Sequence, residues 1–203
     1  MKKPSLKASP SWNIPDLDKR PVVVALSGPN GAGKTTFYEA HLQGCGLRFL
    51  NADILAGELG IDAYQGAEIA AKLRQEFVNQ GESFVFETVF SDPVGDKLGF
   101  LNQAAQQGYI VVVCFIGIAG SVRSEERVAM RVSQGGHDVP TDKLTARFPR
   151  TMGNLKQAIR ELPWVFVFDN DDLGSPFRLL AVFQNGRQKF LAKSIPGWFE
   201  PVL

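Results

Sequence analysis

The chain has 203 residues, which is enough for a hydrophobic core and few enough for a single domain. Its formal net charge of +1 gives no general attraction to nucleic acid or to an anionic membrane, and 44% hydrophobic with 21% charged residues is ordinary for a soluble globular protein. Two cysteines make no disulfide framework, and no apolar stretch approaches the roughly 18 residues that span a bilayer. We therefore expect a cytoplasmic protein with neither nucleic acid nor a membrane as its partner.

Residues 1–20 contain several prolines and little hydrophobic periodicity, which predicts an arm preceding a single domain at 21–203. After the arm, short apolar runs alternate with helical stretches. This alternation predicts an α/β fold, doubly wound, with a mostly parallel five-stranded sheet and helices on both faces. The predicted strands are Val22–Ser27, Arg48–Asn51, Ser83–Glu87, Tyr109–Ile116 and Trp164–Asp169. Their continuous apolar runs are typical of strands buried on both faces.

A glycine-rich loop follows the first predicted strand, matches the pattern G-x-x-x-x-G-K-[ST], and opens a helix predicted over Lys34–Leu42. Its glycines let backbone N–H groups turn inward around an anion, Lys34 adds a positive charge near the terminal phosphates, and the Thr35 hydroxyl can bind Mg²⁺. The predicted nucleotide-binding residues are Gly28, Pro29, Asn30, Gly31, Ala32, Gly33, Lys34, Thr35 and Thr36. The loop therefore predicts a P-loop NTPase that binds ATP and Mg²⁺.

The second predicted strand ends in Asn51-Ala52-Asp53, at the edge where open α/β sheets place their ligands. A carboxylate at Asp53 could accept the proton of a substrate hydroxyl that attacks the γ-phosphate. The alternative is that Asp53 caps a helix beginning at Ile54, and both roles can hold at once. A longer helix is predicted next, over Gln65–Gln80, with Gly81 as its stop.

Glu87 and Thr88 close the third predicted strand, and a helix is predicted over Asp96–Gln107. A carboxylate at the end of an apolar strand is typical of a Walker B residue, which orients the Mg²⁺ shell. Asp169, at the end of the fifth predicted strand, is the rival candidate. Only a strand next to the phosphate-loop strand brings its carboxylate near the metal. The third strand is the usual neighbour, so we favour Glu87 as the metal residue.

Three arginines four residues apart, Arg123, Arg127 and Arg131, share one face of a helix predicted over Ser121–Ser133. Each adjacent like-charged pair costs about 0.2–0.5 kcal/mol in an isolated helix. The repulsion between these like charges is relieved when an anion binds to them. We therefore expect Arg127 and Arg131 to act on the transferring phosphoryl group and Arg123 to contact the nucleotide; the alternative is a solvated basic face.

A bent pair of helices is predicted over Thr141–Leu162, interrupted at Pro149. His137 precedes the pair, and Arg147 and Arg150 bracket the bend; all three are candidates to bind a substrate, although a lone loop histidine is more often structural. Lid and substrate helices thus occupy about residues 120–162. At the end of the chain, two β-rich runs joined by Asn185-Gly186 predict a hairpin over about 177–192.

The motifs of this chain, in their order, resemble those of the zeta-toxin-like P-loop kinases, in a short and divergent branch. The resemblance covers about residues 22–170 and rests on Gly28–Thr36, Asn51-Ala52-Asp53, Phe86-Glu87-Thr88 with Ser91-Asp92-Pro93, Glu126-Arg127 to Arg131, and Gly135–Pro140. It implies transfer of the γ-phosphate of ATP to a sugar hydroxyl, best known from UDP-N-acetylglucosamine, and control by an antitoxin protein. The compact region between Glu87 and Tyr109 departs from the longer members, so the acceptor stays open.

The resemblance also implies roles for single residues. Asp53 is similar to the general base, Lys34 and Thr35 to the residues that bind ATP and Mg²⁺, and Glu87 and Thr88 to residues of the substrate site. Arg127 and Arg131 are similar to the arginines of the lid.

A nucleotide-dependent switch or an ABC-type ATPase module is the alternative functional class. Residues Ser133–Gly136 superficially resemble the LSGGQ signature of such modules, but they lie at the end of a predicted helix rather than before one. A small-molecule kinase with a nucleotide-sugar-like hydroxyl acceptor is therefore the leading hypothesis.

Overall fold

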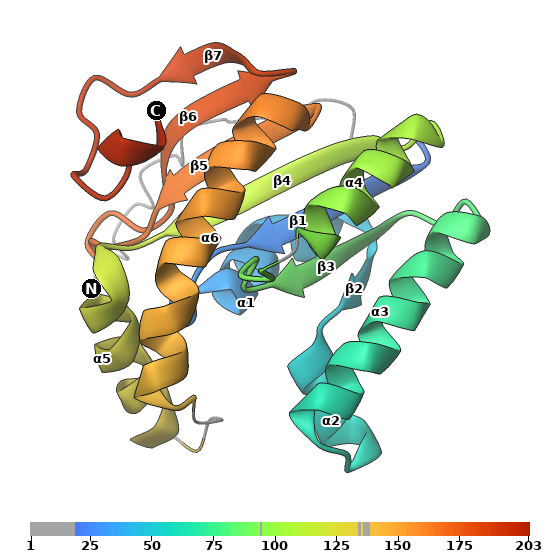
Figure 1. Cartoon of the computed structure of the whole chain (residues 1–203), viewed down its shortest axis with the longest axis horizontal. Coiled ribbons are helices and arrows are strands. Elements are labelled where there is room, and N and C mark those ends of the chain that lie inside the picture. Colours follow the sequence, from blue (N-terminus) through green and yellow to red (C-terminus); the bar gives the residue numbers. More distant parts are fainter. Residues whose placement is uncertain (1–18, 94, 134, 136–138) are drawn as a thin grey trace, which may run out of the picture.

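The computed structural model describes residues 19–93, 95–133, 135 and 139–203, so most of the predicted arm and His137 lie outside the described residues. Its centre is one seven-stranded sheet with strand order β2-β3-β1-β4-β5-β6-β7 (Figure 1). The strands are β1 Val22–Ser27, β2 Arg48–Leu50, β3 Phe84–Thr88, β4 Ile110–Gly117, β5 Trp164–Asp169, β6 Arg178–Gln184 and β7 Arg187–Leu191. The first five are parallel, as predicted.

The sheet has seven strands and not five, because the predicted C-terminal hairpin joins it. Strand β6 pairs antiparallel with β5, and β7 pairs antiparallel with β6. Without β6, the backbone N–H and C=O groups along one edge of β5 would lack partners, and burial of such groups is costly. The hairpin was therefore predicted correctly as a local structure, but its place as the edge of the main sheet was not.

Seven helical segments of four or more residues accompany the strands in the described part of the chain. They are α1 Lys34–Phe37, its π-helical continuation Tyr38–Leu42, α2 Ala52–Leu59, α3 Ala63–Asn79, α4 Asp96–Gln106, α5 Gly120–Ser133 and α6 Thr141–Glu161. Short 3₁₀ turns occur at Gln43–Cys45 and Glu200–Val202. Within the same residues, no helix combines the length and the apolarity that crossing a bilayer would require.

The predicted break at Pro149 is wrong, because α6 runs through this residue as one helix. Proline removes one backbone hydrogen bond and crowds the preceding turn, at a cost of about 3 kcal/mol or more in a helix interior. Here Leu144, Thr151, Leu155 and Ala158 of the same helix are all buried. Packing of this buried face on the rest of the fold therefore outweighs the local penalty.

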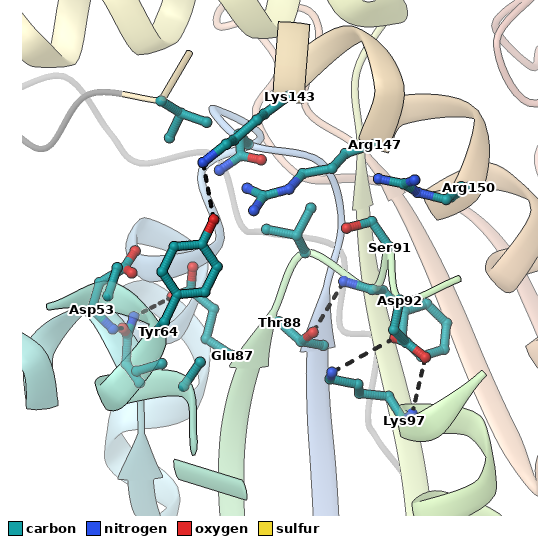
Figure 2. A pocket seen from close by; sticks show the side chains of 18 of the residues that line it. Asp53, Tyr64, Glu87, Thr88, Ser91, Asp92, Lys97, Lys143, Arg147 and Arg150 are labelled. Atoms are coloured by element: carbon teal, nitrogen blue, oxygen red, sulfur yellow. Dashed lines mark hydrogen bonds and ion pairs between the residues drawn. The ribbon is translucent and has the colours of Figure 1, made fainter. Parts of the chain in front are cut away.

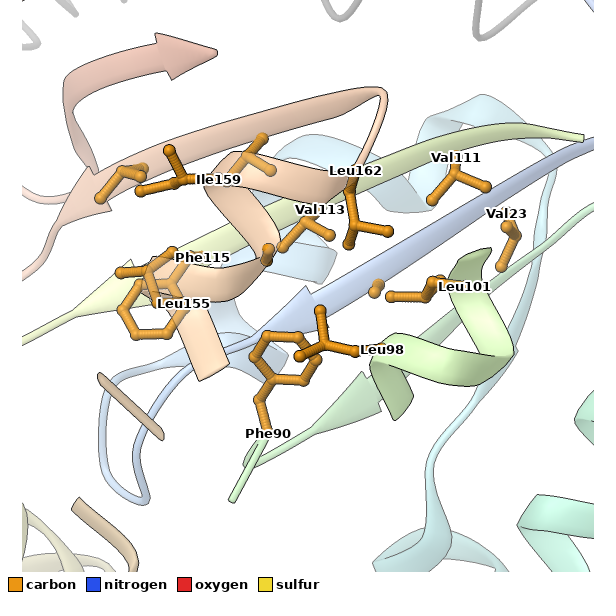
Figure 3. Close-up of a cluster of buried hydrophobic side chains, with 14 of the residues drawn as sticks. Val23, Phe90, Leu98, Leu101, Val111, Val113, Phe115, Leu155, Ile159 and Leu162 are labelled. Atoms are coloured by element: carbon orange, nitrogen blue, oxygen red, sulfur yellow. The ribbon is translucent and has the colours of Figure 1, made fainter. Parts of the chain in front are cut away.

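Hydrophobic side chains cover both faces of the sheet, since successive residues of each buried strand point to opposite sides. On one face, Val23 and Val111 pack with Leu101 of α4 and Leu155 of α6 (Figure 3). Residues of α3 complete this cluster. On the other face, β1 and β4 pack against Phe37 of α1 and its continuation. The predicted mostly parallel sheet with helices on both faces is thus confirmed.

Candidate functional site

The phosphate loop connects β1 to α1 along a path that two of its glycines make possible. Gly28 has φ 139°, and a Cβ atom there would lie 2.1 Å from the carbonyl oxygen of Ile116 in β4. Gly33 has φ 87°, and a Cβ atom there would lie 2.7 Å from Nδ2 of Asn170. Neither position has room for a side chain, so the loop lies directly against β4 and the end of β5.

Two buried side chains that the sequence did not single out hold this loop. The Ser124 hydroxyl, from α5, donates to the carbonyl of Asn30 at 2.6 Å. The Asn170 carboxamide donates to the carbonyl of Ala32 at 2.8 Å and accepts from the backbone N–H of Phe177 at 3.4 Å. Protein groups therefore fix the shape of the loop, which is preformed for an anion rather than moulded by one.

Lys34 lies inside the loop, with only 6% of its side chain exposed. Its Nζ donates to the carbonyls of Gly28 and Pro29, at 3.1 Å each, and lies 3.6 Å from Oε1 of Glu87. Burial lowers the pKa of Lys34, and the Glu87 and Asp53 carboxylates oppose this shift. The loop thus holds a cation at its centre, where the phosphates of a nucleotide would need one.

Glu87 is placed beside this loop because β3 pairs directly with β1, with Glu87 opposite Leu26. Its Oε2 accepts hydrogen bonds from the Thr35 hydroxyl at 3.0 Å and from Nδ2 of Asn51 at 2.9 Å. The rival carboxylate, Asp169, lies on β5, which β4 separates from β1. The adjacency that favoured Glu87 is therefore present in the structure.

Thr35 and Glu87 offer oxygen atoms, the ligand type that Mg²⁺ prefers. No group of three or more acidic, histidine or cysteine side chains able to hold a metal occurs among the residues that the structure describes. An ion of the P-loop type takes most of its ligands from phosphates and water and few from the protein. The hydroxyl and the carboxylate, 3.0 Å apart beside Lys34, suit such an ion.

Asn51, not Asp53, caps α2. The Oδ1 atom of Asn51 accepts from the backbone N–H groups of Asp53 at 2.8 Å and Ile54 at 3.2 Å. The capping alternative for Asp53 is therefore wrong, because the residue two positions earlier already satisfies these donors. The side chain of Asp53 is exposed and forms no hydrogen bond or ion pair with the other described residues. Its carboxylate is left available, close enough to raise the pKa of Lys34.

A cavity of about 510 Å³ adjoins the phosphate loop at Asn30 (Figure 2). We name it the acceptor cavity after the residues predicted to bind an acceptor that line it. Its walls come from α2, α3, the end of β3 with the segment after it, and α6. Among the residues predicted to bind a substrate, five line it: Asp53, Glu87, Thr88, Arg147 and Arg150. Chain segments almost 100 residues apart are thus brought to one space, whose volume is ordinary for a small-molecule site.

Four lining residues with polar or charged side chains were missed by the sequence analysis: Tyr64, Arg74, Lys97 and Lys143. The Lys143 ammonium donates to the Tyr64 hydroxyl at 3.1 Å and so links α6 to α3 (Figure 2). Only Arg74 carried a signal in the sequence. It stands four residues from both Ala70 and Val78, on the buried face of a predicted helix, where a charged residue is unusual.

The wall after β3 is fixed to α6 through backbone carbonyls. The Thr151 hydroxyl donates to the carbonyl of Val89 at 3.0 Å, and the Asn154 carboxamide donates to those of Phe90 at 3.0 Å and Asp92 at 3.1 Å. Phe90 itself is buried with φ 61°, a backbone region that few non-glycine residues adopt. These bonds hold the wall in a conformation that it would not readily adopt alone.

The arginines of α5 lie outside the lining of the acceptor cavity and differ in how they are paired. Arg123 forms ion pairs with Glu126 at 2.9 Å and Asp171 at 3.3 Å. The positive charge of the three arginines is therefore partly neutralised within the protein. Arg127 donates to the carbonyl of Asp171 at 2.9 Å, and burial lowers its pKa. Arg131 lowers the pKa of Lys34 through its charge. The charges of this helix therefore act on the phosphate loop.

Comparisons with solved structures show the same fold at low sequence identity. The match to the complex of AvrRxo1-ORF1 and ORF2 with ATP has a TM-score of 0.66 at 17% identity and covers 86% of this chain and 62% of that one. A proposed kinase from Chloroflexus aurantiacus gives 0.55 at 18% identity, covering 77% and 91%. The PezAT toxin–antitoxin system of Streptococcus pneumoniae gives 0.54 at 14%, covering 74% and 68%. The chain thus spans less than two thirds of the AvrRxo1 chain.

No curated protein matches the chain. The family model described as "AAA domain" matches residues 23–157, which include the phosphate loop, Glu87 and all the residues that line the cavity. This range is well over half of the 203 residues. The chain therefore belongs to the AAA domain family and has an α/β P-loop NTPase fold.

Proposed function

We propose that the protein is an ATP-dependent small-molecule kinase that transfers the γ-phosphate to a hydroxyl of a nucleotide-sugar-like acceptor, such as UDP-N-acetylglucosamine. One observation carries the proposal: the acceptor cavity opens directly against the phosphate loop, and Asn30, Asp53 and Glu87 all line it. A second molecule in this cavity would meet the terminal phosphate of a nucleotide in the loop. Holding both reactants in one site is the main requirement of phosphoryl transfer.

In the proposed reaction, the acceptor hydroxyl oxygen attacks the γ-phosphorus while the bond from that phosphorus to the leaving oxygen of ADP breaks. The proton of the hydroxyl passes to the free carboxylate of Asp53. Lys34 and the nearby Arg127 and Arg131 stabilise the negative charge that moves onto the leaving oxygen. When bound beside Thr35 and Glu87, Mg²⁺ supplies further positive charge to the phosphate oxygens.

Transfer itself is the test of this proposal. Purified protein is incubated with ATP, Mg²⁺ and a set of UDP-linked amino sugars, and the acceptors are examined by mass spectrometry for one added phosphoryl group. We expect one acceptor to gain this group while ADP forms in equal amount. ATP hydrolysis without transfer to any hydroxyl would contradict the proposal and favour a switch or an ATPase module.

A protein partner is a second, weaker part of the proposal. Two of the matched structures are of an ORF1:ORF2 complex and of a toxin–antitoxin system. By analogy of fold, we propose that a small antitoxin-like protein binds this chain and limits its activity. Co-expression with the product of the neighbouring reading frame, followed by size-exclusion chromatography, checks for such a complex, and separate elution of the two proteins would contradict it.

A further inference from the structure

Asp171 lies just beyond the end of β5, and the proposed reaction gives it no role. Two residues before it, Asp169 ends the strand, and between them Asn170 holds the phosphate loop through the carbonyl of Ala32 at 2.8 Å. The backbone N–H of Asn170 also donates to the carbonyl of Gly117 in β4 at 2.9 Å. Asp171 therefore starts from a fixed place beside the loop.

Asp171 contacts α5 through both its side chain and its main chain. Oδ1 of its carboxylate accepts from the backbone N–H of Ala119, directly before the helix, at 3.1 Å and from Nε of Arg123 at 3.3 Å. Its backbone carbonyl accepts from Nη2 of Arg127 at 2.9 Å. One residue thus connects the start of α5 and two of its arginines to the end of β5.

The main chain of Asp171 is held in turn by Asp169, whose carboxylate is buried. Oδ1 of Asp169 accepts from the backbone N–H of Asp171 at 3.3 Å and from the indole N–H of Trp198 at 3.0 Å. Its Oδ2 accepts from Nη2 of Arg178 at 3.1 Å. These bonds fix the orientation of the main chain at Asp171, and with it the direction of the carbonyl that Arg127 contacts.

Arg127 stands where α5 contacts the phosphate loop. A Cβ atom at Gly31 would lie 2.9 Å from the Cβ atom of Arg127. Burial lowers the pKa of Arg127, and the Asp171 carboxylate is the strongest of the charges that oppose this shift. A guanidinium has five N–H donors, and the bond to the Asp171 carbonyl occupies only one of them. The loop is thus bordered by a cation whose direction Asp171 sets.

The contacts of Asp171 serve orientation more than stability. In its ion pair with Arg123, the two side chains are 27% and 46% exposed. Pairs with this exposure contribute little to stability, because water screens them. Holding a long arginine side chain in one geometry costs conformational entropy, however, and protein contacts that fix it beforehand remove this cost from the transfer step.

We infer that Asp171 is a positioning residue for phosphoryl transfer, which holds Arg127 in the direction that the transferring group requires. Asp171 lies outside the lining of the acceptor cavity, so it acts through the arginine and not on the acceptor. The inference rests on the proposed function, in which Arg127 stabilises the charge that moves during transfer. It can nevertheless be tested by binding alone, without an acceptor.

Isothermal titration calorimetry with ADP and Mg²⁺, in the presence and absence of aluminium fluoride, tests the inference. Aluminium fluoride bound beside ADP imitates the phosphoryl group during transfer, and such analogues bind more tightly than the ground state. The affinity for ADP alone reports whether the protein is folded and its phosphate loop intact. The gain in affinity on adding aluminium fluoride reports the contacts to the transferring group. We expect the parent to show such a gain.

Variants assign this gain to Asp171 and to the arginine that it holds. We expect Asp171→Ala to reduce the gain about tenfold, with the affinity for ADP alone unchanged. Asp171→Asn should recover part of the loss, because its amide oxygen can still accept from Ala119. Asp172→Asn makes the same change of charge at the exposed neighbouring residue and is the matched control, which should bind like the parent.

A double variant shows whether Asp171 acts through Arg127. Residues that act as one unit give non-additive losses. The variant that combines Asp171→Ala with Arg127→Met should therefore lose no more of the gain than Arg127→Met alone. Additive losses would mean that Asp171 acts by another route.

Four further results would overturn the inference: a parental gain in Asp171→Ala, an equal loss in Asp172→Asn, a matching loss of affinity for ADP alone in Asp171→Ala, or a parent that gains nothing from aluminium fluoride. Failure of the proposed function gives a different result. In that case the gain would depend on Asp171 and Arg127 as expected, but no acceptor would be phosphorylated when ATP replaces ADP and aluminium fluoride.

Discussion

Around the phosphate loop, buried polar groups meet protein partners: Ser124 and Asn170 hold the loop carbonyls, and Lys34 donates to two more. Across the acceptor cavity, by contrast, Asp53 and the Nε of Arg74 have no hydrogen-bond partner among the described residues. The nucleotide half of the site is therefore complete before any ligand arrives. The acceptor cavity still contains polar groups without hydrogen-bond partners, and a ligand bound there would supply them.

The largest effect is expected on phosphoryl transfer, from substitution of Asp53. Asp53→Asn removes the proposed base without changing the size of the side chain, and we expect transfer to fall about 10²–10⁴-fold. ATP should still bind, because Asp53 forms no hydrogen bond or ion pair with the described residues of the phosphate loop. Single-turnover transfer and ATP binding are measured side by side. Glu58→Gln, an exposed change on the same helix, serves as the control. Transfer that survives Asp53→Asn would show that another group accepts the proton.

On the nucleotide side, Asn170→Ala should lower stability as well as ATP affinity. It leaves the buried carbonyl of Ala32 without its donor, which costs about 1–3 kcal/mol of unfolding free energy. Chemical denaturation gives this difference. Asn102→Ala removes an exposed bond to Glu161 and should cost about 0.5 kcal/mol or less. Equal losses in the two variants would mean that the loop is not held as we describe.

Asn51 has two roles: it caps α2 and it donates a hydrogen bond to Glu87. Two substitutions separate these roles. Asn51→Ser keeps a helix cap but is too short to reach Glu87, so it should raise the Mg²⁺ concentration needed for ATP binding, by about tenfold, with little loss of stability. Asn51→Ala should show the same Mg²⁺ effect and lose about 1 kcal/mol in addition. Mg²⁺ titrations and thermal denaturation give the two quantities. If both variants bind ATP at the same Mg²⁺ concentration as the parent, the hydrogen bond from Asn51 to Glu87 does not affect Mg²⁺ binding.

The smallest effect is expected at the exposed link between α3 and α6. Tyr64→Phe removes only the hydroxyl that accepts from Lys143; the Tyr64 side chain is exposed and Lys143 is half-buried. We expect a change in unfolding free energy of less than about 0.5 kcal/mol. A loss of unfolding free energy as large as that of Asn170→Ala would show that hydrogen bonds between the walls of the acceptor cavity stabilise the fold as much as those around the phosphate loop.

Local patterns were enough to predict the elements that depend on nearby residues. The apolar runs of β1 and β5 have the predicted bounds, and the phosphate-loop pattern lies between a strand and a helix as expected. The choice of Glu87 over Asp169 needed only the strand order, for which the usual neighbour of β1 in this class was a sufficient guide.

Features that depend on tertiary packing escaped prediction. Asn51 and Asp53 are both good caps, and only the structure shows which of them faces the helix end. Ser124 and Asn170 are ordinary polar residues until the fold brings α5 and β5 against the loop. Pro149 is compatible with a helix only because the rest of α6 is buried. Ser124, Asn170 and Pro149 thus depend on contacts between distant segments, and at Pro149 these contacts outweigh the local preference.

The attachment of the wall after β3 has a consequence for which residues of the cavity can be exchanged. Thr151 and Asn154 hold the main chain of this wall, not its side chains. A substitution at Ser91, which lines the cavity, would therefore change the lining while the wall stays in place. Such a change alters the cavity without touching the phosphate loop, whose contacts lie on α5 and after β5.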